Sequence, residues 1–287
     1  MGTHLSVLEQ YEKSKQATSS NSISQEDRLK KYFTTVLPKG VRSAEKRIRI
    51  LPTKDGSSPF VEIYFHEIQV DGKWVKLFDP KQEGKPSPLN DVYDGLMMTG
   101  VDADRELARQ YRARKYYVVK VIDRDNEADG VKFWRFKFSS KGDGVFDKIY
   151  PIFKNKGDIT DPEEGRDIIV TLGLSKSNNG KEYTSVSSII PEDKSKLHDD
   201  PEVSKEWAED EMIWSDVYAK KPFEYLDMVA KGETPKWSND AKKWISEADT
   251  QADETIATGK SESAVKQNVI VDPQADDEAA EEDDLPF

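Results

Sequence analysis

The alternation of apolar and polar residues predicts a body built mainly of short β-strands. From Arg47 to Ile50 the period is two, which places Arg47 and Arg49 on one strand face and the two isoleucines on the other. Turn sequences at 71–72 and 178–180 join predicted strands into hairpins. The other segments with a strand pattern are 60–70, 73–78, 115–123, 131–138, 167–175 and 181–190.

Helical patterns are shorter and flank the strands. Residues 28–37 are predicted to form an amphipathic helix that ends before Pro38, and residues 102–112 a second helix. Residues 201–230 space their aromatic and aliphatic side chains at nearly helical intervals, which predicts one or two amphipathic helices. The turn-rich residues 79–90 predict a loop.

These patterns divide the chain into four parts. Residues 1–27 form a polar, flexible N-terminal arm, and residues 28–190 form the strand-rich core. Residues 191–245 are a helical extension packed on the core, and residues 246–287 are a disordered tail. The predicted fold is mainly β with added helices: an OB-fold, which is a five-stranded Greek-key barrel, with insertions. A β-sandwich is the alternative.

Charge is unevenly distributed along the 287 residues. The chain holds 43 basic and 55 acidic side chains, a net charge of −12, which by itself speaks against nucleic-acid binding. Residues 246–287, however, hold 13 acids and two bases, a net of −11, whereas residues 28–150 have a net charge of +7. The chain is therefore a basic body with an acidic end.

Several classes of site and function are excluded by residues the chain lacks. With no cysteine there is no disulfide, thiolate zinc site or cysteine nucleophile. The three histidines, His4, His66 and His198, are far apart in sequence and predict no metal site. Neither a catalytic motif, an apolar run of membrane-spanning length nor a signal peptide is found. We expect a cytoplasmic, non-enzymatic protein without cofactor or membrane contact.

Basic residues alternate with aromatic residues in several predicted strands. Cations neutralise phosphates and flat rings stack on unpaired bases, each stacked ring contributing about 1–3 kcal/mol whatever the base. The alternative is a core of aromatic side chains beneath a solvated charged face. The candidate DNA-binding residues are Lys46, Arg47, Arg49, Lys54, Arg112, Arg114, Lys115, Tyr116, Tyr117, Phe133, Trp134, Arg135 and Lys137.

The C-terminus ends in an unusual sequence for an apolar-poor tail. Pro286 and Phe287 follow the acidic residues Asp283 and Asp284 and the aliphatic Leu285. A terminal phenylalanine offers a ring and a carboxylate to a pocket with an apolar floor and a basic rim, which predicts a partner-binding tip. The alternative is an acidic tail that serves solubility alone.

Several segments together resemble the T-even phage single-stranded DNA-binding, or helix-destabilising, proteins. The resemblance covers roughly residues 28–190. It is carried by RIRILPTKDGSSPFVEIYFHE at 47–67, GKW at 72–74, YRARKYYVVKVID at 111–123, KFWRFKF at 132–138 and FDKI at 146–149. The shared order of these motifs is more specific than any one of them.

This resemblance implies an OB-fold core that binds single strands cooperatively and without sequence preference. It also implies self-association through the N-terminal arm and partner binding through an acidic C-terminal domain. Zinc-binding members carry a histidine and three cysteines here; this chain keeps His66 but has no cysteine, so zinc is not expected. The tip Asp283–Phe287 is similar to that of bacterial single-stranded DNA-binding proteins, where it docks replication and repair enzymes.

The function predicted is that of a phage protein that coats single-stranded DNA in replication, recombination and repair. Its partners would be single-stranded DNA and, through the tip, a polymerase, helicase or primase, or recombinase. If the protein is phage-encoded, its location is the host bacterial cytoplasm. The alternatives are an RNA-binding OB-fold protein and an acidic, DNA-mimicking interaction protein.

Overall fold

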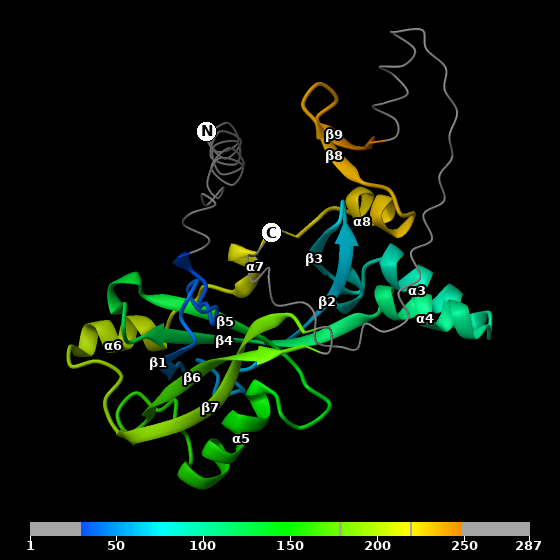
Figure 1. Ribbon diagram of the computed structural model, residues 1–287. Coiled ribbons are helices and arrows are strands. Elements are labelled where there is room, and N and C mark those ends of the chain that lie inside the picture. Colours follow the sequence, from blue (N-terminus) through cyan, green and yellow to red (C-terminus); the bar gives the residue numbers. More distant parts are fainter. Residues whose placement is uncertain (1–29, 178–179, 219, 248–287) are drawn as a thin grey trace, which may run out of the picture.

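The computed structural model describes residues 30–177, 180–218 and 220–247, and its centre is one antiparallel sheet of seven strands (Figure 1). The strand order is β3-β2-β4-β1-β6-β7, with β5 paired to β4. The strands are β1 Ser43–Ile50, β2 Val61–Val70, β3 Lys73–Phe78, β4 Ala113–Asp123, β5 Val131–Lys137, β6 Arg166–Lys176 and β7 Glu182–Lys194. The predicted mainly β architecture with added helices is confirmed.

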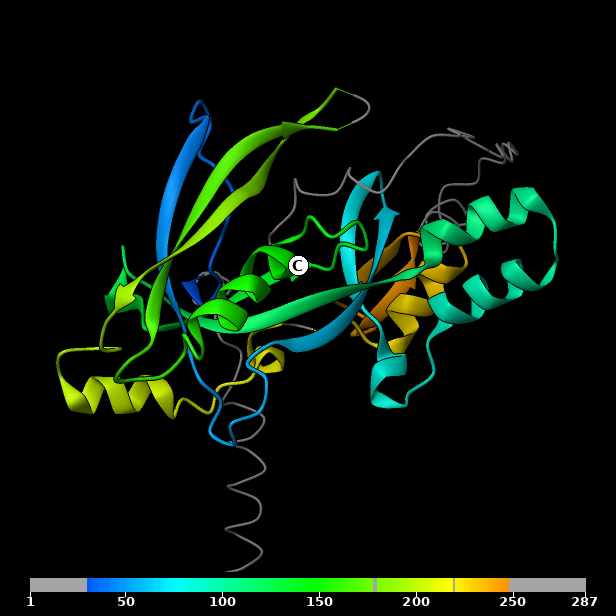
Figure 2. The same ribbon diagram turned by 90° about the horizontal axis from the view of Figure 1, so that it is seen from below.

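Strand β4 joins the two halves of the molecule. Its first half pairs with β2, its last residues pair with β1, and β5 pairs along most of its length. Figure 2 shows β4 running from the helices α3 (Pro88–Met98) and α4 (Asp102–Tyr111) towards α6 (Pro201–Ala208). Both faces of β4 are covered over most of residues 116–123, which explains the nearly continuous apolar run there.

Two apolar cores lie on opposite faces of the sheet. One contains Ile48, Tyr117 and Trp134 and is closed by helix α5 (Val145–Lys156). The other contains Phe65, Tyr116 and Phe133 and is covered by the segment around α7 (Trp214–Val217). The alternation of β4 therefore directs Tyr116 and Tyr117 into different cores.

The predicted helix over residues 28–37 is wrong beyond residue 30. Residues 33–37 have no regular structure, and Tyr32 forms an isolated bridge to Phe133. The Phe33 N–H donates to the Phe133 carbonyl over 2.9 Å, and the Phe33 ring packs edge-on against Trp134 at 5.7 Å. An isolated helix of this length is marginal in water, so pairing with the edge of β5 prevails.

Residues 79–90 are only partly the predicted loop. A 3₁₀ turn occupies Pro80–Glu83 and helix α3 starts at Pro88.

The helical segment predicted at 201–230 contains α6, α7 and α8 (Phe223–Ala230). The hairpin of β8 (Pro235–Ser238) and β9 (Lys243–Ser246), which follows α8, was not predicted. A second 3₁₀ turn spans Glu127–Asp129.

A buried polar cluster joins β2, α3 and the end of α4. The His66 ring is fully buried, with Nδ1 2.7 Å from the Tyr111 carbonyl and Nε2 3.5 Å from Asp79 Oδ1. Asn90 also donates to Asp79 Oδ1 over 2.7 Å. Burial acts to raise the pKa of Asp79, but the hydrogen bonds from His66 and Asn90 outweigh it and lower the pKa to about 2.

The described residues contain no cluster of three or more His, Asp or Glu side chains able to hold a metal. The surroundings of His66 therefore do not fit the zinc that the resemblance associates with this position; hydrogen bonds and packing hold this part together instead. Within the same described ranges, no helix is both long and apolar enough to cross a bilayer. The predicted N-terminal arm and nearly all of the acidic tail lie outside the described residues.

Candidate nucleic-acid interface

Some of the candidate DNA-binding side chains lie in the interior. A buried ring presents no free face to a base, and a buried cation does not reach a phosphate, so the surface proposed below omits these residues. Their burial follows from the two cores described above, which cover both faces of β4 and β5. The interior candidates are Arg49, Tyr116, Tyr117, Phe133, Trp134 and Arg135, each no more than 9% exposed.

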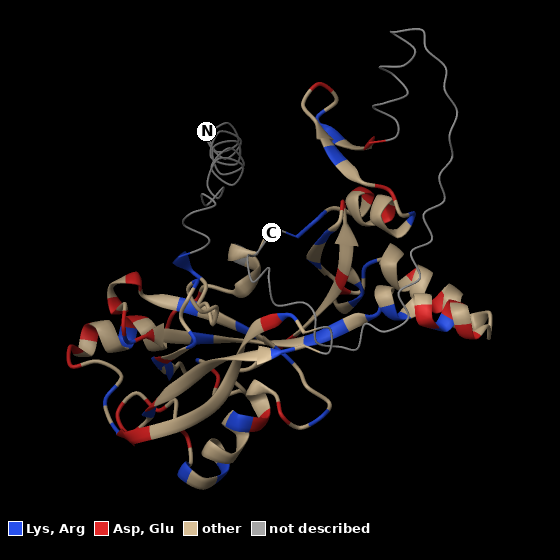
Figure 3. Ribbon diagram, viewed as in Figure 1, with Lys and Arg blue, Asp and Glu red and all other residues tan. Residues whose placement is uncertain are grey.

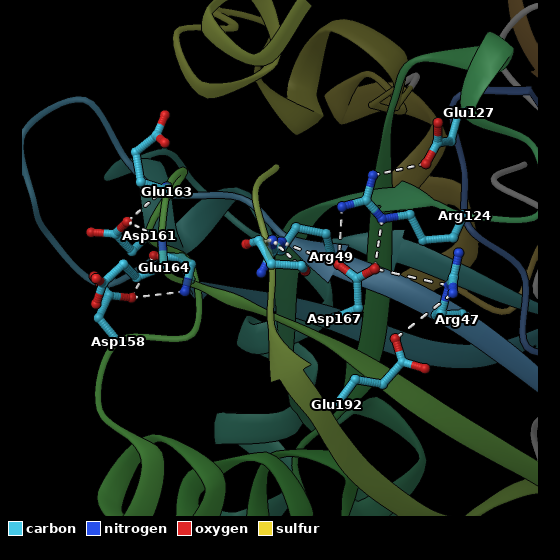
Figure 4. Close-up of polar contacts among 12 residues, drawn as sticks. Arg47, Arg49, Arg124, Glu127, Asp158, Asp161, Glu163, Glu164, Asp167 and Glu192 are labelled. Carbon is cyan, nitrogen blue, oxygen red and sulfur yellow. Dashed lines mark hydrogen bonds and ion pairs between the residues drawn. The ribbon is translucent and has the colours of Figure 1, made fainter. Parts of the chain in front are cut away.

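Arg49 lies at the centre of a buried ionic cluster (Figure 4). Its Nε is 3.2 Å from Asp167 Oδ1, and its Nη2 donates to the Ser195 carbonyl over 2.6 Å. Arg124 binds both oxygens of Asp167, at 2.9 and 3.0 Å, and also Glu127. Burial lowers the pKa of Arg49, and the attraction of Asp167 opposes that shift. Arg49 thus links β1 to β6 and to the end of β7.

Arg47 lies at the rim of this cluster. Its side chain is half-exposed and is 3.9 Å from both Asp167 and Glu192. The prediction that Arg47 and Arg49 share one face is therefore confirmed. On this face the positive charge of both arginines is balanced by the carboxylate of Asp167.

Four other candidate cations form ion pairs near the surface. Exposed ion pairs contribute about 0–1 kcal/mol, so a phosphate can replace the carboxylate at little cost. Lys46, Lys54 and Lys115 therefore stay candidates for a phosphate contact, whereas the Glu67 side chain is only 9% exposed and would be left buried without Lys137. The pairs are Lys46 with Asp125 at 3.3 Å, Lys54 with Glu211 at 2.7 Å, Lys115 with Glu62 at 2.5 Å and Lys137 with Glu67 at 2.9 Å.

The start of β4 is a basic part of the sheet. Arg112 is exposed at the junction of α4 and β4, and Arg114 and Lys115 follow it within the strand. Figure 3 shows lysine and arginine at this end of β4 and on β3, which β2 separates from β4. Because side chains alternate along a strand, Arg114 and Lys115 point to opposite faces of the sheet.

The Lys115 face carries an exposed ring. Lys115 Nζ lies 5.0 Å from the centre of the Phe138 ring and 5.1 Å from that of Tyr117. Phe138 is 39% exposed. The hydrogen bond to Glu62 raises the pKa of Lys115, which keeps this amine charged over the physiological range.

The Arg114 face carries a different exposed ring. Glu67 accepts hydrogen bonds from the Tyr116 hydroxyl and Lys137, and its register partner on β3 is Lys76. Burial acts to raise the pKa of Glu67, but Lys137 and Tyr116 outweigh it and hold the pKa below its usual range. Two residues before Lys76, on the same face of β3, Trp74 is 40% exposed.

Comparison with known proteins now adds an independent finding. The family described as "gp32 DNA binding protein like" matches residues 42–231. The chain belongs to this family. No curated protein matches the chain.

The residues matched by the family include the start of β4. The match extends from just before β1 to the end of α8 and includes Arg112, Arg114 and Lys115. This family is one of DNA-binding proteins rather than of enzymes. The β8–β9 hairpin, in contrast, lies beyond the matched residues.

The exposed rings Trp74 and Phe138 were not among the predicted site residues. Both belong to segments with a recognisable pattern, GKW at 72–74 and the predicted strand that ends at Phe138. The available signal was their position near strand ends: Trp74 is the second residue of β3, and Phe138 directly follows β5.

Proposed function

We propose that the protein binds single-stranded DNA without sequence preference and coats it during phage DNA replication, recombination and repair. The observation that carries the proposal is the match to the gp32-like DNA-binding family across the basic start of β4. Arg112, Arg114 and Lys115 contact phosphates, and exposed rings beside them stack on bases.

Preference for single strands follows from the type of contact. Stacking on Trp74 or Phe138 needs bases that are unpaired and turned away from their own neighbours. A duplex offers phosphates alone to the same surface, so its binding loses the stacking contribution. Stacking does not depend on the identity of the base, which gives binding that tolerates any sequence.

The direct test is a fluorescence titration of the full chain with oligo-dT, the corresponding oligo-U and a duplex, at several salt concentrations. We expect tightest binding to oligo-dT, quenching of tryptophan emission and a steep loss of affinity with salt. Tighter binding to oligo-U would identify an RNA-binding protein. No binding to any of the three at low salt would support an acidic interaction protein instead.

A pair of single substitutions identifies the face that carries the bases. Trp74 and Phe138 lie on opposite faces of the same sheet and are equally exposed. If the bases stack on the Arg114 face, Trp74→Ala weakens binding about 5- to 150-fold and Phe138→Ala has little effect. The reverse result assigns the Lys115 face, and equal, small effects would contradict stacking on either ring.

The strand connections support proposing an OB-type core. Five strands, β1, β4, β5, β6 and β7, pair as β5-β4-β1-β6-β7, with α5 between β5 and β6 in the chain. This is the strand count of an OB-fold. Residues 51–112, including β2, β3, α3 and α4, then form a large insertion between its first two strands.

The acidic tail is proposed to compete with DNA and to recruit partner enzymes through Asp283–Phe287. The tail's net charge of −11 resembles that of a polyphosphate and is tethered to a basic body, which gives it a high effective concentration. Deleting residues 276–287 is expected to tighten DNA binding at low salt and abolish capture of replication enzymes. Unchanged affinity of the truncated chain at low salt would contradict the competition.

The N-terminal arm is proposed to mediate self-association along DNA. Residues 1–29 lie outside the described part of the chain, so this proposal rests on the family resemblance alone. Removing them should lower cooperativity on long single strands while leaving affinity for a short oligonucleotide unchanged, as measured by the same titration.

A further inference from the structure

The β8–β9 hairpin presents an indole ring that the fold does not bury. Trp237 is 50% exposed and pairs across the hairpin with Trp244, their ring centres 5.6 Å apart. Trp244 in turn packs edge-on against Tyr225 of α8 at 4.8 Å. The hairpin is therefore anchored through Trp244, and half of the Trp237 surface remains open.

Positive charge surrounds this pair of rings. Lys221 Nζ lies 5.1 Å from the Tyr225 ring and 5.3 Å from the Trp244 ring, and burial lowers its pKa. Residues 235–247 add Lys236, Lys242 and Lys243 against Asp240 and Glu247, a net charge of +1, and Lys236 forms an ion pair with Glu247. An exposed aromatic ring among cations is the combination that binds single strands by stacking and phosphate contact.

The hairpin lies close to one end of the candidate interface. Figures 1 and 2 both show β8 and β9 beside the end of β2 and β3. Val75 and Trp244 pack against the same apolar cluster, and Val75 lies on the face of β3 opposite to Trp74, so the hairpin and Trp74 lie on either side of this edge strand. A DNA strand that follows the Arg114 face to Trp74 therefore reaches Trp237 by passing over the edge of β3.

We propose that the β8–β9 hairpin is an additional single-strand binding site, in which Trp237 stacks on a base and Lys242 and Lys243 contact phosphates. The site lies outside the residues shared with the gp32-like family and lengthens the DNA footprint of this chain. The inference rests on the proposed function, because it extends the same bound strand.

The test compares Trp237→Ala with the full chain on oligo-dT of increasing length. Affinity for long oligonucleotides should fall about 5- to 150-fold, whereas affinity for the shortest ones that bind should be unchanged. The footprint should also shorten. The matched control is Tyr150→Ala, which removes a ring that is 57% exposed on α5, a helix that lies apart from the hairpin (Figure 1).

A second variant separates lost binding from a frayed hairpin. The double variant Lys242→Glu, Lys243→Glu keeps the pair of indole rings, whose coupling is visible in circular dichroism. It should show the same loss of affinity for long oligonucleotides and a smaller slope of log K against log salt. The inference would be overturned if both variants bound long oligonucleotides as tightly as the full chain does. Tight binding of oligo-dT by the full chain would in that case still support the proposed function.

The acidic tail is the competing occupant of this hairpin. If Trp237→Ala changes affinity in the full chain but not in a chain that lacks residues 276–287, the hairpin binds the tail and the inference is wrong. If the loss persists without those residues, DNA is the occupant.

Discussion

Replacing Arg112, Arg114 and Lys115 together with alanine will weaken binding to single-stranded oligonucleotides about 100-fold at 0.1 M salt. Each phosphate contact on a single strand contributes about −0.7 to the slope of log K against log salt, so three contacts contribute about −2. The loss should therefore shrink towards 1 M salt. Fluorescence titrations at four or more salt concentrations measure both the affinity and the slope.

The control for this triple variant removes the same charge from a nearby surface. Arg105 and Arg109 on α4 are exposed and pair within the helix with Asp102 and Glu106. Replacing both with alanine, together with Lys154 on α5, should change the slope by much less. A triple variant at β4 with an unchanged slope would show that DNA binds elsewhere on the protein.

Arg49→Ala will destabilise the fold by about 3 kcal/mol or more, because breaking a buried ion pair leaves buried charge behind. Asp167 keeps Arg124, but the Ser195 carbonyl loses its charged donor and the interior gains a cavity. Proteins of this kind are stable by about 5–15 kcal/mol, so the loss is a large fraction of the total. Urea unfolding followed by circular dichroism measures it.

Arg47→Ala is the matched control for Arg49. The Arg47 side chain is half-exposed and its carboxylate partners are 3.9 Å away, so its removal should cost less than about 1 kcal/mol. Arg49→Lys should destabilise the fold by an amount between those of Arg47→Ala and Arg49→Ala, because one ammonium cannot bind Asp167 and Ser195 in the guanidinium's geometry. Unchanged stability of Arg49→Ala combined with weaker DNA binding would restore Arg49 to the DNA interface.

The strand at Arg47–Ile50 shows what periodicity can and cannot predict. The alternation correctly placed Arg47 and Arg49 on one face. It did not show that β6 and β7 bring Asp167 and Ser195 to this face, more than a hundred residues further along the chain. The same alternating pattern occurs whether the cation is exposed or buried, because burial depends on which segments pack against that face of the strand.

The aromatic candidates show the same limit. Tyr116, Phe133 and Trp134 were predicted as stacking rings because they stand beside cations in sequence. The structure buries them because helix α5, the segment around α7 and residues 32–33 cover both faces of β4 and β5. Rings at strand ends, Trp74 and Phe138, are left accessible.

By itself, the sequence determined most strand positions, the basic start of β4, the division between a basic body and an acidic end, and a resemblance that the family match supports. These are local properties, set by side-chain period, charge and motif order. The tertiary structure alone decided which cations are buried, which rings stay exposed and where the β8–β9 hairpin lies. Those depend on contacts between distant segments, which a local pattern does not encode.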